Sequence, residues 1–560
     1  MMPSADRHGR DPFRALPLTG RLTPMARAAL IALVALGIRV AFVLQFSGQP
    51  LFDANLAQGT DMQALIGWAR RIAGGDILGR GAGPFWWAPL FPHALGAVFW
   101  LLGPTALVGA ALVQCALGAV TAGLLYLLGR RLFDETTGLV AGLLAAGYGL
   151  SIFLTGIFLS TTLEVFLVVA TLLALTRARQ APSNGRWFGA GLTAGLACLA
   201  RPNFLLGTLA VWLLLPLQIR RADGGSDWPR VRQAAAVFAV GLLFAIAPAT
   251  LHNWAVGGQF VLISAAGPET FRIANSYDST PVNFVYPKQP LMPLTSIGFW
   301  RHQARKAVLF WWGFEAPQNV SYYLARSLTP ILQWPWVPFW LAVPLAAVGI
   351  WASRQRAPAL LHVYVFCGSY YLSVVAFFII ARWRLALVIP LLTFSAAGLV
   401  AFLRWALNRE WGRAAAGSLL VVGLTVLVYP GRGPFLFPAD HGQLGYILAN
   451  RGDYAGAVSH LQQAAADLPT NGALHRDLGL LLQRLGRTAE ARAALERAVA
   501  LAPDDPRVHL ALGSLLLAAG SDRPRATAHL QRVLALAPES AAAAEARTML
   551  GALAAEGQRR

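Results

Sequence analysis

The sequence changes character near residue 432. Long apolar stretches dominate the chain before this point, whereas the residues after it alternate apolar and polar types as a water-soluble helical protein does. After residue 432, certain positions recur every 34 residues, namely the pairs Leu444-Gly445, Leu478-Gly479 and Leu512-Gly513, and the single glycines Gly452, Gly486 and Gly520. The chain is therefore expected to place an apolar unit in a bilayer and to continue as a soluble array of repeats.

The repeat period identifies the kind of array. A period of 34 residues with small residues inside and a closing proline is typical of tetratricopeptide repeats, and Pro469 and Pro503 keep this period while Pro538 comes one residue late. We predict three helix pairs over about 441–550, inside a repeat domain of 441–560 that follows a linker at 431–440. About three repeats are the minimum for a stable array, and such arrays bind proteins, so we expect a protein partner.

The region before residue 432 is predicted to be an all-α bundle with about 11 membrane spans and further juxtamembrane helices. Hydrophobic residues make up 56% of the chain and charged residues only 13%, against about 25% in soluble domains. The candidate spans are 28–46, 108–128, 138–157, 163–177, 187–200, 203–218, 233–251, 336–352, 360–380, 385–404 and 414–430. This gives a membrane domain of 28–430.

The net charge of +20 does not indicate nucleic-acid binding, because many arginines lie in short loops between apolar stretches and no nucleic-acid-binding signature is visible. The three cysteines, Cys115, Cys198 and Cys367, lie in apolar stretches at spacings that suggest neither a disulfide nor a metal site. The sequence requires no cofactor. A divalent metal is compatible with the chemistry inferred below, but no residue pattern supports one.

The arginines also predict the orientation. Residues 1–27 carry five arginines and are expected to be a cytoplasmic tail. The apolar stretch 86–103 contains Pro89, Pro92 and His93, and the positive-inside rule is best satisfied if this stretch is re-entrant or juxtamembrane. Eleven crossings then put the repeats outside the cytoplasmic (inner) membrane, together with two long loops at 47–107 and 252–335.

Two carboxylates stand out on this outer side. Asp61 lies at the start of an amphipathic helix predicted over 60–76, where an aspartate is either a helix cap or an exposed catalytic group, or both. Glu164 lies at the outer end of a span. A carboxylate at membrane depth tends to mark function, whereas one at the interface is simply solvated.

Three arginines break the positive-inside pattern because they face outward: Arg201, Arg382 and Arg384. Outward arginines need a partner, and phosphate is the obvious candidate because the planar guanidinium binds it with two hydrogen bonds.

Several motifs resemble those of the C-type membrane glycosyltransferases, and are most similar to the protein O-mannosyltransferase and aminoarabinose transferase superfamily. Over residues 28–405 they keep their order, as Asp61…Trp68-Ala69…Gly75-Asp76…Pro84-Phe85…Pro92…Gly103, Leu127…Phe133, Leu163-Glu164, Gly195…Arg201-Pro202-Asn203, Ala247-Pro248…Asn253…Gly257…Phe260…Asn275, Lys306…Glu315…Asn319 and Arg382-Trp383-Arg384…Pro390. The resemblance implies a polyprenyl-phosphate sugar donor, with Asp61 and Glu164 as catalytic residues and Arg201, Arg382 and Arg384 on the donor phosphate. Further candidate substrate-binding residues are Pro89, Pro92, His93, Asn253, Lys306 and Glu315.

The predicted function is transfer of the sugar to a lipid, glycan or protein acceptor on the extracytoplasmic face. Arginines would stabilise the phosphate charge that develops, and a carboxylate would take the acceptor proton, which inverts the sugar if the displacement is direct. The alternative is a non-enzymatic scaffold or a transporter that recruits partners through the repeats. A transporter should show interrupted spans in corresponding halves, and no internal repeat is visible in the membrane region.

Overall fold

The computed structural model describes residues 22–56, 60–79, 83–219, 225–282, 287–429, 438–520 and 522–559. It divides into two compact units, Met1–Gly433 and Pro434–Arg560. All elements of the described residues are helices, so the predicted all-α fold is confirmed. Most of the predicted cytoplasmic tail (residues 1–21) and most of the predicted linker (residues 431–437) lie outside the described residues.

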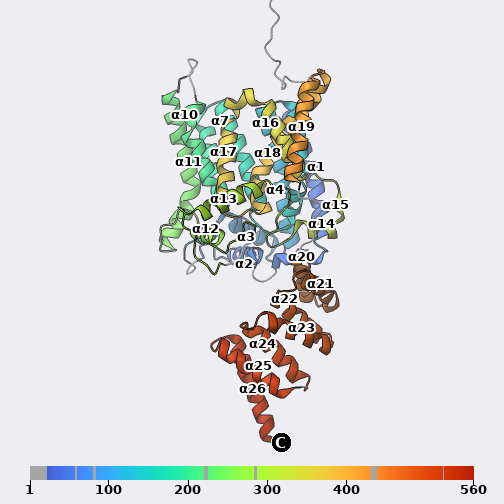
Figure 1. The fold of residues 1–560 in the computed structure, drawn as a ribbon. Coiled ribbons are helices and arrows are strands. Elements are labelled where there is room, and N and C mark those ends of the chain that lie inside the picture. Colours follow the sequence, from blue (N-terminus) through green and yellow to red (C-terminus); the bar gives the residue numbers. More distant parts are fainter. Residues whose placement is uncertain are drawn as a thin grey trace, which may run out of the picture. The chain divides into compact units, whose positions relative to one another are not determined.

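The first unit is a bundle of apolar helices (Figure 1). Seven described segments are long and apolar enough to cross a membrane: α1 (Pro24–Phe46), α4 (Leu107–Leu132), α7 (Thr161–Gln180), α11 (Trp228–Ala255), η3 (Arg354–Arg356) with α17 (Ala357–Val375), α18 (Ala381–Leu407) and α19 (Trp411–Val428). The predicted polytopic membrane unit is therefore confirmed.

Shorter helices occupy the remaining predicted spans: α5 (Glu135–Ala146), α8 (Asn184–Ala200), α9 (Phe204–Leu213) with α10 (Leu215–Gln218), and α16 (Phe339–Ala352). Glycines let two of them approach a long neighbour. A Cβ at Gly191 of α8 would lie 2.0 Å from the Phe238 carbonyl oxygen of α11, and one at Gly349 of α16 would lie 1.9 Å from that of Phe394 in α18. Any side chain at these two positions would push the helices apart.

The prediction of one continuous helix over 138–157 is wrong. Helix α5 ends at Ala146, and the chain continues as α6 (Gly149–Phe153) and the short η2 (Leu154–Gly156). The carbonyl of Gly147 in the break accepts a hydrogen bond from the amide of Val337 at 3.0 Å, so another segment takes over a bond that a continuous helix would have made itself.

Short helices gather at one end of the bundle, among them α2 (Asp61–Ala73), α3 (Leu90–Leu102) and α12 (Gly267–Asn275) (Figure 1). Helix α2 buries the face predicted from its periodicity: Met62, Leu65, Ile66, Ala69 and Ile72. Helix α3 has 13 residues, fewer than the roughly 20 that a span needs. The other short elements are η1 (Pro50–Leu56), α13 (Ile297–Phe310), α14 (Tyr322–Leu328) and α15 (Pro330–Gln333).

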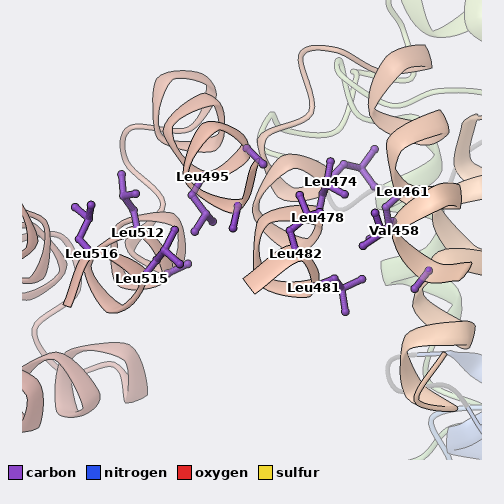
Figure 2. Packing of buried hydrophobic residues seen from close by; sticks show 14 of the residues in the cluster. Val458, Leu461, Leu474, Leu478, Leu481, Leu482, Leu495, Leu512, Leu515 and Leu516 are labelled. Carbon is purple, nitrogen blue, oxygen red and sulfur yellow. The ribbon is translucent and has the colours of Figure 1, made fainter. Parts of the chain in front are cut away.

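The second unit is the predicted repeat array. It contains three helix pairs, α20 (Pro438–Asn450) with α21 (Tyr454–Asp467), α22 (Gly472–Arg484) with α23 (Thr488–Leu501), and α24 (Pro506–Ala518) with α25 (Arg523–Leu536), followed by α26 (Ala541–Arg559). Figure 2 shows Leu461 of α21 beside Leu474 and Leu478 of α22 in the shared core.

The 34-residue period has a packing cause. A Cβ at Gly445, Gly479 or Gly513 would lie 2.8, 2.6 or 3.1 Å from a leucine of the following helix, so each pair closes on a glycine. Gly452, Gly486 and Gly520 end the first helix of each pair with φ of 85, 75 and 61°, a conformation that favours glycine.

Candidate functional site

Asp61 is the first residue of α2 and not its cap. The cap is Thr60, whose hydroxyl accepts a hydrogen bond from the Gln63 amide at 3.2 Å. The cap interpretation of Asp61 is therefore wrong. Its carboxylate points to other parts of the chain, since Oδ2 accepts hydrogen bonds from Arg382 Nη2 at 2.9 Å and from Gln318 Nε2 at 3.3 Å.

Gln318 connects the acid and the arginine. Its Oε1 accepts a hydrogen bond from Arg382 Nε at 2.7 Å, while its Nε2 donates to Asp61. It is held in a tight turn, because the next residue, Asn319, has φ of 67° and Gln318 and Val320 form an isolated bridge. Sequence reasoning missed Gln318. The only signal was its position between Glu315 and Asn319 in one of the motifs.

Glu164 and Arg201 form a second pair. Arg201 Nε and Nη2 donate to Glu164 Oε2 and Oε1 at 2.7 and 2.9 Å, which is a two-bond ion pair. The Ser160 hydroxyl also donates to Oε1. The side chain of Glu164 is 0% exposed, against 34% for Asp61. Both oxygens of Glu164 are therefore used, and the solvated-interface interpretation does not hold.

The two ion pairs lie close enough to act on each other. The Arg201 guanidinium carbon is 4.9 Å from the ring centroid of Trp383, the neighbour of Arg382. Arg201 interacts electrostatically with Asp61, and Arg382 with both Arg201 and Glu164. The structure thus brings together four of the five charged residues predicted to act in catalysis or phosphate binding.

A cleft lies beside Arg382 and Gln318. One side is apolar and comes from the segment after the α5–α6 break, through Leu150, Phe153, Leu154, Ile157 and Leu159. Arg382, Gln318 and Glu315 supply polar groups elsewhere in the lining. The lining thus joins an apolar side to polar and charged groups.

Arg384 is not brought to this group. Its Nη1 donates to the carbonyls of Phe310 and Trp312, and its Nη2 to the carbonyl of Phe314 and to Glu315 Oε2 at 2.6 and 2.8 Å. Glu315 in turn accepts from the Tyr148 hydroxyl at 3.3 Å, and burial raises the pKa of its carboxyl against the opposing effect of Arg384. Both terminal nitrogens of Arg384 are engaged in holding the 310–315 turn.

The predicted substrate-binding residues near α3 make hydrogen bonds to the backbone of neighbouring loops. The His93 ring contacts the Pro89 carbonyl at 2.7 Å and the Ile77 carbonyl at 3.1 Å, while Pro89 and Pro92 lie at the start of α3. Asn253 accepts from the Phe85 amide at 2.8 Å and donates to the carbonyls of Val261 and Ile263. These contacts connect the segments 77–93 and 252–265.

Lys306 of α13 is fully buried. Its ammonium donates to Asn275 Oδ1 and the Phe377 carbonyl, both at 2.9 Å, and to the Ala376 carbonyl at 3.4 Å. Burial lowers the pKa of Lys306 to about 7. Its ammonium group reaches the C-terminal end of α17, where a cation satisfies carbonyls that have no partner inside the helix. Within the described ranges, no group of three or more His, Cys, Asp and Glu side chains is arranged to hold a metal ion.

Two segments match known families. Residues 87–254 match the dolichyl-phosphate-mannose-protein mannosyltransferase family, and residues 448–515 match a tetratricopeptide repeat family. The resemblance predicted from the sequence is confirmed. The first match includes Glu164 and Arg201. No curated protein sequence matches the chain.

Solved structures are similar at low identity. ArnT from Cupriavidus metallidurans bound to undecaprenyl phosphate is 14% identical, with 91% of this chain and 79% of that chain covered and a TM-score of 0.43. The Archaeoglobus fulgidus oligosaccharyltransferase in the apo form is 14% identical, with 72% and 55% covered and a TM-score of 0.36. AglB from Archaeoglobus fulgidus, in complex with an inhibitory peptide and a dolichol-phosphate, is 14% identical, with 77% of this chain and 59% of that chain covered and a TM-score of 0.42. The chain therefore spans less than two thirds of the length of the two archaeal proteins.

Proposed function

We propose that this protein is an inner-membrane glycosyltransferase that moves a sugar from a polyprenyl-phosphate donor to a lipid, glycan or protein acceptor on the extracytoplasmic face. The observation that carries the proposal is the pairing of Asp61 with Arg382, which lines a cleft with an apolar wall, together with the nearby pairing of Glu164 with Arg201. The match to the mannosyltransferase family supports the same class of reaction.

The donor phosphate binds between Arg201 and Arg382 in this proposal. Each arginine uses Nε and Nη2 in the bonds described above, so that Nη1 takes no part in them. The two Nη1 groups are the proposed phosphate contacts, and the apolar wall takes the prenyl chain. Because the site is largely buried, fixed cations stabilise the charge of the leaving phosphate more strongly than water would. Arg384 is left out of the phosphate site because its terminal nitrogens are engaged.

Asp61 is the proposed general base. Both of its hydrogen bonds end on Oδ2, and Oδ1 takes the proton of the acceptor hydroxyl or amine. The acceptor forms a bond to the anomeric carbon while the bond from that carbon to the phosphate oxygen breaks, and the phosphate leaves with the electron pair. Direct displacement of this kind inverts the anomeric centre. Glu164 acts by orienting Arg201, since both of its oxygens are occupied.

Donor binding tests the phosphate site. Arg201→Ala and Arg382→Ala should each raise the Kd for a polyprenyl monophosphate by about tenfold or more, which corresponds to roughly 1.4 kcal/mol. Arg71→Ala, an exposed arginine of α2, is the matched control and should bind as wild type does. Unchanged donor affinity in both site variants would refute the phosphate assignment. Mass spectrometry of glycolipids and glycoproteins in a deletion strain and in wild type would identify the acceptor.

Orientation needs a separate test. Eleven crossings from a cytoplasmic N-terminus place the repeats and the site on the extracytoplasmic side. Alkaline phosphatase fused after Arg560 should be active, since it folds only outside the cytoplasm. A fused reporter that works only in the cytoplasm would contradict this topology.

A further inference from the structure

Arg39 is a buried cation in the membrane-spanning helix α1 that the site described above does not use. Its side chain is 1% exposed. Its four hydrogen bonds go to neutral oxygens at 3.2 Å each: Nη1 donates to the carbonyls of Ala35 and Ala146, and Nη2 to the carbonyl of Ala145 and the hydroxyl of Ser151. A charged side chain in a membrane helix is costly and tends to be retained for a function.

Three of these bonds lie at the α5–α6 break. The last carbonyls of a helix have no partner inside the helix, and a break at membrane depth cannot use lipid to satisfy them. Arg39 takes the carbonyls of Ala145 and Ala146 at the end of α5, where the helix dipole also favours a cation. Its bond to Ser151 reaches into α6, so one side chain holds both sides of the break.

Gly118 of α4 packs closely against the side chain of Arg39. A Cβ added to Gly118 of α4 would lie 2.8 Å from Arg39 Nε and 3.2 Å from its Cδ. Gly118 therefore keeps Arg39 in position by having no side chain. This gives a second place at which the contact can be disturbed without changing Arg39 itself.

The segment that follows the break forms the apolar side of the cleft. Leu150 and Phe153 belong to α6, and Leu154 begins η2. The far end of the segment is held separately, since Asn55 donates to the Gly156 carbonyl at 3.1 Å and accepts from the Phe158 amide at 3.0 Å. The position of the apolar wall relative to Arg382 thus depends on Arg39 at one end and on Asn55 at the other.

We propose that Arg39 is a positioning residue that fixes the α5–α6 break and so holds the apolar wall of the cleft at the place where the prenyl chain of the donor binds. The inference rests on the proposed function, because a prenyl chain is the apolar group that this wall would meet next to Arg382. Arg39 lies outside the charged group. In this proposal it determines how strongly the protein discriminates between donors of different chain length.

Binding of two prenyl monophosphates tests the inference: geranyl monophosphate as the short probe and a long-chain polyprenyl monophosphate. Arg39→Met and Gly118→Ala should weaken binding of the long probe by about tenfold and leave that of the short probe nearly unchanged, since only the long chain extends along the wall. Arg39→Lys should restore some of the preference. Gly37→Ala is the control on α1, because nothing lies within 4 Å of the added Cβ.

Hydrogen–deuterium exchange of 147–160 is a second readout that needs no ligand. Exchange there should be faster in Arg39→Met and Gly118→Ala than in wild type or Gly37→Ala, because the break loses its cap. Unchanged exchange in both variants, equal weakening for both probes, or a wild type without a preference for the long probe would each overturn the inference. Failure of the proposed function would appear differently, as a wild-type protein that prefers the long probe but transfers no sugar.

Discussion

The two acidic residues of the site have different surroundings, which predicts different roles. Asp61 is partly exposed and uses one oxygen for its bonds, whereas Glu164 is fully buried and uses both. A carboxylate that must take a proton from an arriving acceptor has to be reachable. A carboxylate that orients an arginine has to be fixed. At the residue scale this difference supports Asp61 as the proposed base and Glu164 as the proposed positioning group.

Asp61→Asn should abolish transfer while leaving the protein folded. The amide keeps the shape of the side chain but cannot accept the acceptor proton, and loss of a general base costs about 10²–10⁴ in rate. The side chain of Asp61 is 34% exposed and that of Glu164 is 0% exposed, so the lost pair with Arg382 should cost less stability than loss of the pair between Glu164 and Arg201. The measurements are turnover and thermal unfolding of the purified protein in detergent. Asp76→Asn, an exposed aspartate after α2, is the control, and near-wild-type turnover of Asp61→Asn would show that it is not the base.

Glu164→Gln should act mainly on stability and donor binding. It leaves Arg201 without its counter-charge in a buried place, and breaking a buried ion pair in this way costs about 3–5 kcal/mol. We expect a lower unfolding temperature than for Asp61→Asn, together with a raised Kd for the polyprenyl monophosphate. Thermal unfolding of the two variants side by side measures the difference. A Glu164→Gln protein as stable as wild type would contradict the positioning role.

The sequence singles out four charged residues that the structure brings together, but it does not predict how they pair. Asp61, Glu164, Arg201 and Arg382 were identified because each is a charge in an apolar or outward-facing context. Pairing of Asp61 with Arg382 joins residues 321 positions apart, and Gln318 between them is an ordinary polar residue in a loop. Such contacts depend on how distant segments pack, and no local pattern encodes that packing.

At the scale of elements, apolar periodicity in the sequence predicts where helices form but not where a helix is interrupted. The buried face of α2 and the repeat helices follow from apolar spacing, because the period of a helix is visible in the sequence. The break after Ala146 is not visible in that way. Gly147 is one of several glycines in apolar stretches, and what satisfies the break is Arg39 of another helix and Val337 of a distant loop.

Two histidine pairs in the repeat array make its stability depend on pH. Nδ1 of His441 lies 3.1 Å from Nδ1 of His460, and Nδ1 of His509 lies 3.0 Å from that of His529. Each contact needs one donor and one acceptor, so a pair with both rings protonated cannot keep it. In the middle repeat, His475 occupies the position of the first histidine, 34 residues from both His441 and His509. The position 34 residues after His460 is Ala494, so the middle repeat lacks the second histidine of the pair.

Acid should loosen the first and third helix pairs. Burial and the nearby His441 lower the pKa of His460, while Asp453 has the opposite effect. Burial, His509 and Arg525 lower the pKa of His529, and Glu496 and Asp522 have the opposite effect. The unfolded chain then binds more protons than the folded one below the ordinary histidine pKa of about 6.5. Stability is therefore full above that pH and is lost as the pH falls towards the lowered values.

Hydrogen exchange of the full chain measures this effect. Protection of α20–α21 and α24–α25 should be constant above about pH 6.5 and should fall as the pH drops below that value. The double variant His460→Ala with His529→Ala should reduce this pH dependence, whereas His475→Ala should leave it as in wild type. A double variant with the wild-type pH profile would refute the role of the pairs.

At the scale of the whole molecule, the chemistry and the repeats belong to different units. Asp61, Glu164, Arg201 and Arg382 all lie in the first unit, and the core of the repeats is formed from residues of the second. Each unit buries its own apolar residues. The repeats are therefore expected to select or position a protein partner or a protein acceptor, and the transfer step is expected not to need them.

Truncation after Val428 should leave a folded enzyme. Val428 is the last residue of α19, and its carbonyl, which accepts a hydrogen bond from the Gly313 amide at 2.7 Å, is retained. The truncated protein should still cleave the lipid donor in the presence of a small acceptor mimic, because every residue of the proposed site remains. Transfer to the native acceptor in cells should drop, since the partner is no longer recruited. The control is the same truncation with Asp61→Asn, which should be inactive. A truncated protein that stays monodisperse and thermally stable but loses all activity towards the mimic would place the repeats in the chemistry itself.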